Sequence, residues 1–154
     1  MAVYTKLSEN NLKDFFSKYN LGKLLGYKGI KEGIENTNYY IETESGKFIL
    51  TVYEKRVEEK DLPFFMGLMR NLYDANFPSP EPIINNNGNY VTNILNKKAA
   101  IVSFLNGSAK KNFSPHDCHE VGVQAAKLHL ITKKLTGKRE NKLSVNSWRK
   151  IYKK

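Results

Sequence analysis

The feature that most constrains the fold is a pair of β-rich segments joined by a short turn. Residues 39–43 and 48–53 are rich in aromatic and β-branched side chains, which favour strands. The Ser45-Gly46 connection between them has the composition of a hairpin loop. The two segments are therefore expected to be antiparallel neighbours, and an antiparallel sheet is the starting point for the fold.

Three segments around this hairpin carry helical signals. Apolar residues within residues 12–19 recur with the spacing of one helix face. A second helix is predicted over residues 61–75, and a third over residues 114–130, where Ser114 can act as the N-cap. The order of elements indicates an α+β fold, in which helices cover one antiparallel sheet. Further strands are predicted for residues 81–84, 89–94 and 99–105.

Positive charge is concentrated towards the carboxy-terminal end of the sequence. The formal net charge is +10, but residues 1–132 hold 16 Lys or Arg against 14 Asp or Glu, whereas residues 133–154 hold nine basic residues against Glu140 alone. A basic segment can bind nucleic acid or an acidic membrane. Its Lys and Arg are scattered without interleaved aromatic residues, so a solvated segment is the favoured interpretation and a nucleic-acid-binding module the minor alternative.

Cysteine and histidine usage argues against a disulfide scaffold and a metal centre. Cys118 is the single cysteine, which fits a reducing cytoplasm. His116, His119 and His129 find no fourth ligand, so no zinc site is predicted. The first residues lack the features of a signal peptide, and no apolar run approaches the ~18–20 residues of a membrane helix. A cytoplasmic protein is therefore expected.

Five collinear motifs resemble a known family of kinases. The run from Lys28 to Tyr39 is similar to the first loop of the aminoglycoside-phosphotransferase-like kinases. The other motifs are Phe48–Arg56, Asp61–Phe65, Ala100–Gly107 and Ala125–His129, with Met1–Thr5 matching as well. Together they resemble the bacterial homoserine kinases of this type, over essentially the whole chain. The resemblance implies a protein-kinase-like small lobe over residues 1–105, followed by a hinge or linker and the incomplete start of a helical lobe over residues 106–154.

The activity implied by this resemblance is the ATP-dependent phosphorylation of the hydroxyl of L-homoserine, a step of threonine biosynthesis. The implied partners are ATP, Mg²⁺ and the small-molecule substrate, with neither nucleic acid nor membrane. In the family, the catalytic loop and the metal-binding Asp lie in the helical lobe, and this sequence has no His-x-Asp motif. The chain is therefore expected to be an amino-terminal half, inactive alone. Another small-molecule kinase of the superfamily, acting on an aminoglycoside or choline, is the main alternative.

The resemblance also indicates which residues contact the nucleotide. Gly33, Asn36 and Asn38 belong to the loop expected to cover the phosphates, where backbone N–H groups and side-chain amides can donate to an anion. An ordinary hairpin turn is the alternative for this loop. Candidate hinge residues, which would meet the adenine through backbone groups, are Ser103, Phe104 and Leu105.

Two residues on and just after the following strand, Thr51 and Lys55, are candidates for contacting the nucleotide. Thr51 stands where many relatives have Lys or Arg. Lys55, near the strand end, is the predicted phosphate contact, with a solvated cation beside neighbouring acids as the alternative. The middle of the predicted helix 61–75 has no acid that could pair with such a base, so the lysine–glutamate pair of kinases is not expected.

Overall fold

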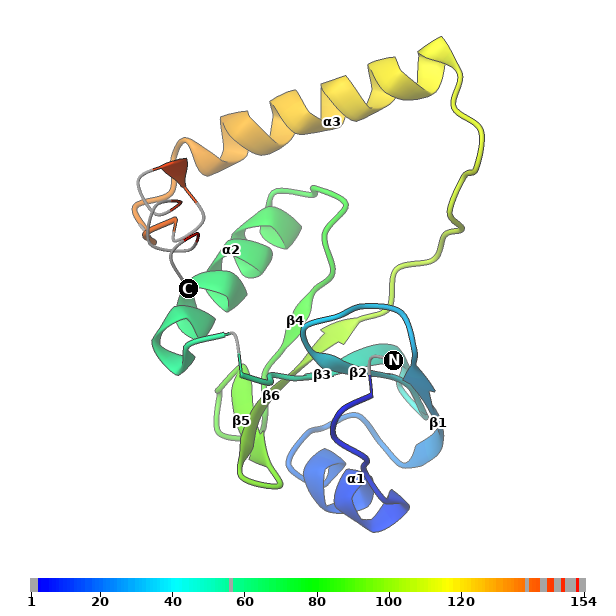
Figure 1. The fold of residues 1–154 in the computed structure, drawn as a ribbon. Coiled ribbons are helices and arrows are strands. Elements are labelled where there is room, and N and C mark those ends of the chain that lie inside the picture. Colours follow the sequence, from blue (N-terminus) through cyan, green and yellow to red (C-terminus); the bar gives the residue numbers. More distant parts are fainter. Residues whose placement is uncertain are drawn as a thin grey trace.

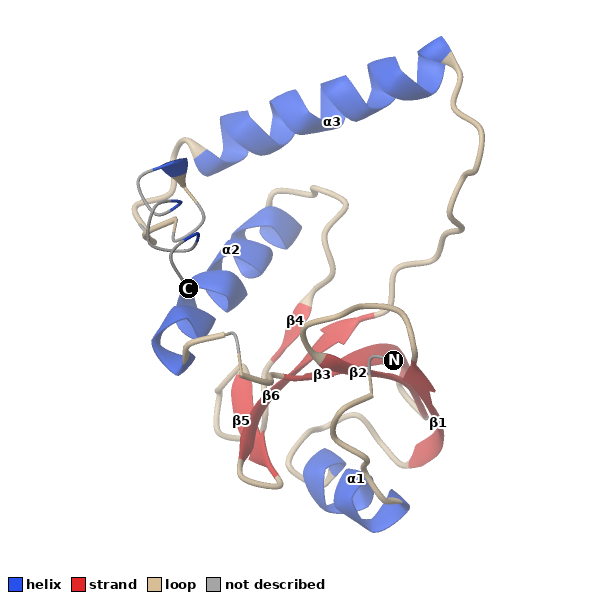
Figure 2. Cartoon of the chain, in the orientation of Figure 1, coloured by secondary structure: helices blue, strands red, loops and turns tan. Residues whose placement is uncertain are grey.

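A computed structural model describes residues 3–55, 57–137, 139–141, 144, 145, 148 and 152. Its elements run in the predicted order of a helix, three strands, a second helix, three more strands and a third helix (Figures 1 and 2). In chain order they are α1 (Glu9–Phe16), β1 (Leu24–Ile30), β2 (Thr37–Thr43), β3 (Gly46–Val52), the 3-10 turn η1 (Glu59–Asp61), α2 (Leu62–Asp74), β4 (Pro82–Ile83), β5 (Val91–Ile94), β6 (Lys97–Ser103) and α3 (Pro115–Thr132).

The strands form one antiparallel sheet in the order β1-β2-β3-β6-β4, and β5 also pairs with β6. The predicted hairpin is confirmed, because Thr43 of β2 lies opposite Gly46 of β3. β6 comes from far along the chain and pairs with β3, so that Ser103 lies opposite Phe48. Phe48 in turn lies opposite Ile41 of β2. The end of β6 is therefore level with the middle of β2, with β3 between the two strands.

The sheet has two chemically different faces. Alternate residues of β2 and β3 are buried, as expected when one face of a strand packs on a core. That face contributes Leu50 and Val52 to a hydrophobic core that also contains Phe15 of α1. Figure 1 shows α1 and the amino-terminal segment on this side of the sheet. The opposite face carries polar residues such as Asn38 and Thr51, which are half-buried.

The strands differ from their predicted bounds by one or two residues at an end, and in β6 the difference affects the candidate hinge. The strand predicted over residues 99–105 is shifted two residues towards the amino terminus, because the turn before it is tighter than expected. Leu95-Asn96 joins β5 to β6 with φ angles of +45° and +61°. Two positive φ angles give the hairpin turn that matches strand twist, but Leu-Asn is not a usual sequence for it. As a result, Phe104 and Leu105 lie just beyond the strand.

The first helix is also shorter than its apolar spacing indicates. α1 begins after a capping box made by Ser8 and Asn11 and ends at Phe16. Tyr19 follows in a turn, yet its ring is buried and lies 5.3 Å from the ring of Phe15, centroid to centroid. The helical spacing therefore identified core residues correctly and the helix end incorrectly.

The two later helices differ in how they are held. α2 buries Leu62, Met66 and Leu72. α3 begins at a capping box made by Ser114 and Asp117, but none of its residues, all of which are described, is buried.

In the described part of the chain, no helix combines the length and the apolar character that crossing a membrane requires.

Candidate functional site

The first loop, residues 31–36, joins β1 to β2 and contains the predicted glycine. Gly33 has a φ of +106°, a conformation that side chains disfavour, so glycine suits this bend. A pocket of about 320 Å³, called below the pocket under the first loop, lies against the amino-terminal arm of this loop. Its lining residues are Lys28, Gly29, Ile30, Lys31, Glu32 and Tyr40.

Two asparagine side chains at the other end of this loop are held in one orientation. The backbone N–H of Glu54 donates to Asn36 Oδ1 at 3.3 Å, and the hydroxyl of Thr51 donates to Asn38 Oδ1 at 2.8 Å. Because each oxygen is an acceptor already in use, each amide nitrogen is turned away from that partner. Neither amide nitrogen has a hydrogen-bond partner among the described residues, so both can donate to a ligand oxygen.

Thr51 orients the side chain of Asn38 on the neighbouring strand. It lies directly opposite Asn38 in the β2–β3 register, and its hydroxyl fixes the Asn38 amide. A threonine carries no charge, so at this position it cannot neutralise a phosphate as a lysine would. The structure thus brings Asn36, Asn38 and Thr51 together around the start of β2.

Lys55 lies apart from the pocket under the first loop. It is exposed, follows the end of β3, and lines a different pocket of about 260 Å³ together with Tyr53, Lys97 and Lys98. Its contact with phosphate remains a prediction. The basic side chains that line the pocket under the loop are instead Lys28 and Lys31, which sequence reasoning missed.

A pattern in the sequence could have drawn attention to Lys28. In an antiparallel hairpin, residues that lie opposite one another share a face of the sheet. Lys28 lies opposite Tyr40, which belongs to the same face as Asn38. Ile30, the last residue before the first loop, lies opposite Asn38, and Lys28 is the next residue on the same side of β1. Alternation along the strand therefore places Lys28 on the polar face.

The candidate hinge residues differ in which backbone groups they leave available. The N–H of Ser103 donates to the carbonyl of Glu81 at 2.9 Å, and the N–H of Phe104 donates to that of Lys47 at 3.0 Å. No described residue accepts a hydrogen bond from the N–H of Leu105. Of the three, Leu105 therefore offers the N–H donor that an adenine would need.

The ring of Phe104 connects the hinge segment to the polar face of the sheet. It meets the ring of Tyr40 edge to face, with centroids 5.4 Å apart and an interplanar angle of 88°. Tyr40 also lines the pocket under the first loop. The hinge segment and the first loop are thus linked through one residue of β2.

A partly buried ion pair lies next to the site, but it does not involve α2. Glu54 follows β3 and pairs with Lys97 at the start of β6. Burial acts to raise the pKa of the Glu54 carboxyl, but hydrogen bonds from Lys97, Thr5 and Thr37, with the charge of Lys97, outweigh it and leave the pKa below its ordinary value. In α2 the first acid is Asp74, which pairs with Arg70.

Solved structures identify the class of protein that this fold defines. The chain matches an amicoumacin kinase, solved in complex with AMP-PNP, Ca²⁺ and Ami, with a TM-score of 0.67 and 16% identity over 86% of this chain and 42% of that one. It matches a spectinomycin phosphotransferase, solved with ADP and spectinomycin, with a TM-score of 0.66 and 14% identity over 97% of this chain and 46% of that one. The fold is that of the amino-terminal lobe of a protein-kinase-like phosphotransferase.

The sequence comparisons then assign the family. The profile of the phosphotransferase enzyme family matches residues 26–151, and the chain belongs to that family. It is 45% identical over 152 residues to a homoserine kinase of Bartonella tribocorum (strain CIP 105476 / IBS 506), a match that covers 99% of this chain and 48% of the relative. The chain spans about half the length of the curated relatives it matches. The predicted fold and family are both confirmed.

Proposed function

We propose that the protein containing this chain transfers the γ-phosphoryl group of ATP to the hydroxyl of L-homoserine, and that residues 1–105 form its nucleotide-holding lobe. Residues 106–154 would provide the hinge or linker and the start of the helical lobe. The observation that carries the proposal is the 45% identity to a homoserine kinase over 99% of the chain. We infer a cytoplasmic enzyme of threonine biosynthesis from the same similarity.

The polar face of the sheet suits the phosphates of ATP. The amide N–H groups of Asn36 and Asn38, which have no acceptor among the described residues, are neutral donors that can bind phosphate oxygens. Lys28 and Lys31 add positive charge beside the same loop. The N–H of Leu105 suits an adenine nitrogen acceptor. Phosphoryl transfer depends mainly on such positioning and on stabilisation of charge.

The Mg²⁺ that accompanies ATP would need carboxylate ligands from elsewhere. Within the described residues, no group of three or more His, Cys, Asp or Glu side chains could hold a metal ion. We propose that the metal-binding Asp and the catalytic Asp lie beyond residue 154. The metal would neutralise phosphate charge, whereas this chain's residues would hold the nucleotide against the sheet.

The experiment is an assay of the complete protein that contains residues 1–154. Purified protein with MgATP and L-homoserine should release ADP, and ³¹P NMR should show O-phospho-L-homoserine as the product. Choline, spectinomycin and an aminoglycoside serve as competing acceptors, and the 154-residue chain alone, which should release no ADP, serves as the control. Turnover with another acceptor and none with homoserine would replace the proposal by a different kinase of the family.

A further inference from the structure

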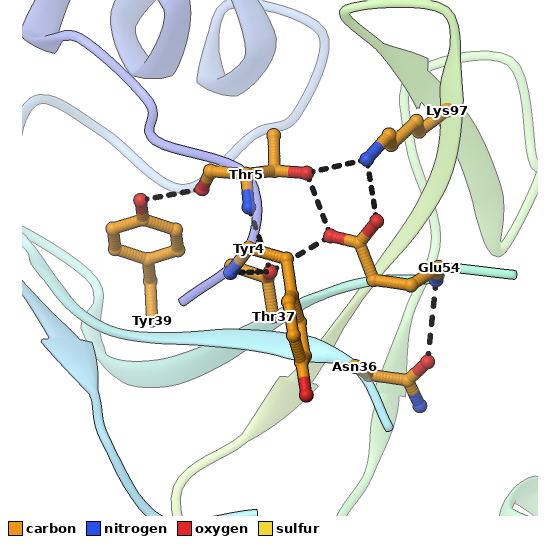
Figure 3. A network of polar contacts seen from close by, with 7 residues as sticks. All are labelled: Tyr4, Thr5, Asn36, Thr37, Tyr39, Glu54 and Lys97. Atoms are coloured by element: carbon orange, nitrogen blue, oxygen red, sulfur yellow. Dashed lines mark hydrogen bonds and ion pairs between the residues drawn. The ribbon is translucent and has the colours of Figure 1, made fainter. Parts of the chain in front are cut away.

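We propose that the amino-terminal segment Val3–Leu7 is a positioning strap, which fixes the donors Asn36 and Asn38 through Thr37 and Glu54 (Figure 3). The proposal rests on the proposed function, because it assigns these residues a role in holding ATP. The strap crosses the buried face of the sheet, while the donors serve the polar face.

Thr37 is the point at which the strap meets the loop. It separates Asn36 from Asn38 in the sequence and is fully buried. Its Oγ1 accepts hydrogen bonds from the backbone N–H groups of Tyr4 at 2.9 Å and Thr5 at 3.0 Å, and donates to Glu54 Oε1 at 2.8 Å. A side chain held by three hydrogen bonds fixes the backbone that carries both asparagines.

Glu54 completes the arrangement from the exit of β3. Its carboxylate accepts from the hydroxyl of Thr5 at 2.6 Å and pairs with Lys97, while its backbone N–H orients the amide of Asn36. The Glu54 side chain is only 10% exposed. A carboxylate so removed from water requires these partners, so the strap, the loop and β6 are held as one unit.

The strap is also tied down on either side of Thr5. The hydroxyl of Tyr39 donates to the carbonyl of Thr5 at 2.8 Å and accepts from the N–H of Leu7 at 3.0 Å. At the other end, the hydroxyl of Tyr4 donates to the carbonyl of Ile34, inside the first loop, at 2.9 Å. The Tyr4 bond thus holds the strap to the first loop, and the two Tyr39 bonds hold it to β2, directly after that loop.

The test compares variants of the complete protein. Thr37→Val and Glu54→Ala should each raise the KM for MgATP about tenfold, since a small displacement of positioned groups is costly, and should leave the KM for L-homoserine nearly unchanged. Thr37→Ser, which keeps the hydroxyl, should restore the wild-type KM. The double variant should raise the KM no further than the larger single effect, because the two residues act as one unit.

Ile101→Val is the matched control, because it weakens the core without touching the network. Binding of MgATP, measured by calorimetry without acceptor, separates the two proposals. If the Thr37 and Glu54 variants melt at lower temperature but bind MgATP as tightly as Ile101→Val does, the strap only stabilises the fold and the inference is overturned. Wild-type protein that binds MgATP without phosphorylating homoserine would overturn the acceptor assignment alone. Wild-type protein that binds no MgATP would overturn both.

Discussion

The lobe that contains the sheet, residues 1–105, and helix α3 are stabilised in two different ways. Every residue of the hydrophobic core cluster lies between Leu7 and Ile101, on segments distant in sequence. The 18 residues of α3, all described, include none that is buried, and Val121 and Leu130 are 69% and 67% exposed. The lobe is thus held by long-range packing, whereas α3 is held mainly by its own local signals.

The local signals of α3 lie at its amino-terminal end. Ser114 and Asp117 form a capping box there, and Lys110 pairs with Asp117. Most of the stability of a helix in a protein comes from the packing of its apolar face, which caps and helical hydrogen bonds do not replace. The lobe therefore defines its own structure through its core, whereas α3 needs its exposed apolar side chains covered before it becomes stable.

The largest expected effect is on the core of the lobe. Leu50→Ala should destabilise the chain by about 2–5 kcal/mol, because Leu50 is fully buried and its truncation leaves a cavity. Leu130→Ala on α3 should change the stability by less than about 0.5 kcal/mol. Urea denaturation followed by circular dichroism measures both. Equal losses for the two variants would break the comparison.

The next largest effect is expected on the affinity for MgATP, which the lobe should determine and α3 should not. In the complete protein, Asn36→Ala and Asn38→Ala should each weaken MgATP binding by about 10–100-fold, because each removes a hydrogen bond to a charged group. Lys133→Ala, close to the end of α3, should leave binding within about twofold, as a surface charge does. Calorimetric titration with AMP-PNP and Mg²⁺ gives the constants. A larger loss for Lys133→Ala than for the asparagines would place the nucleotide elsewhere.

A pH effect follows from Glu54. Its pKa is lower in the folded chain than in the unfolded chain, so folding favours its ionised form. The stability it contributes should be present above the ordinary glutamate pKa and lost as the pH falls through the lowered value. Glu54→Gln should flatten that part of the stability curve. Chemical denaturation at a series of acidic pH values tests this, and an unchanged slope in the variant would contradict it.

The smallest effect concerns the start of α3. Hydrogen bonds from Lys110 and Ser114 lower the pKa of Asp117 to about 2. The cap should therefore persist above the ordinary aspartate pKa and weaken as the pH falls towards 2. NMR titration of the Asp117 carboxyl carbon measures this directly. An ordinary aspartate midpoint would contradict the hydrogen bonds that Lys110 and Ser114 donate to the Asp117 carboxylate.

Local patterns predicted much of the fold. The hairpin of β2 and β3 and the three helices follow from side-chain periodicity, turn residues and caps, all of which act over a few residues. The start of β6 was missed because Leu95-Asn96 adopts an uncommon turn for its sequence. The end of α1 was missed because Tyr19 is buried by tertiary packing outside the helix.

In the candidate site, too, local sequence predicts some of the residues, whereas their orientation depends on contacts between distant segments. Gly33, Asn36 and Asn38 came from a motif in consecutive residues. The orientation of the two amides depends on Thr51 and on Glu54, which reach them only when β2 and β3 pair. The Thr5–Glu54 and Thr5–Lys97 contacts join residues 49 and 92 positions apart, a juxtaposition that no local pattern encodes.

The most direct test of the account is hydrogen exchange of the complete protein with and without AMP-PNP and Mg²⁺. We predict that β3 and β6 exchange slowly in both states, and that the nucleotide slows exchange in the first loop, at the start of β2 and at Leu105. Protection gained only within residues 110–154, with the first loop unchanged, would contradict the claim that this lobe holds the nucleotide.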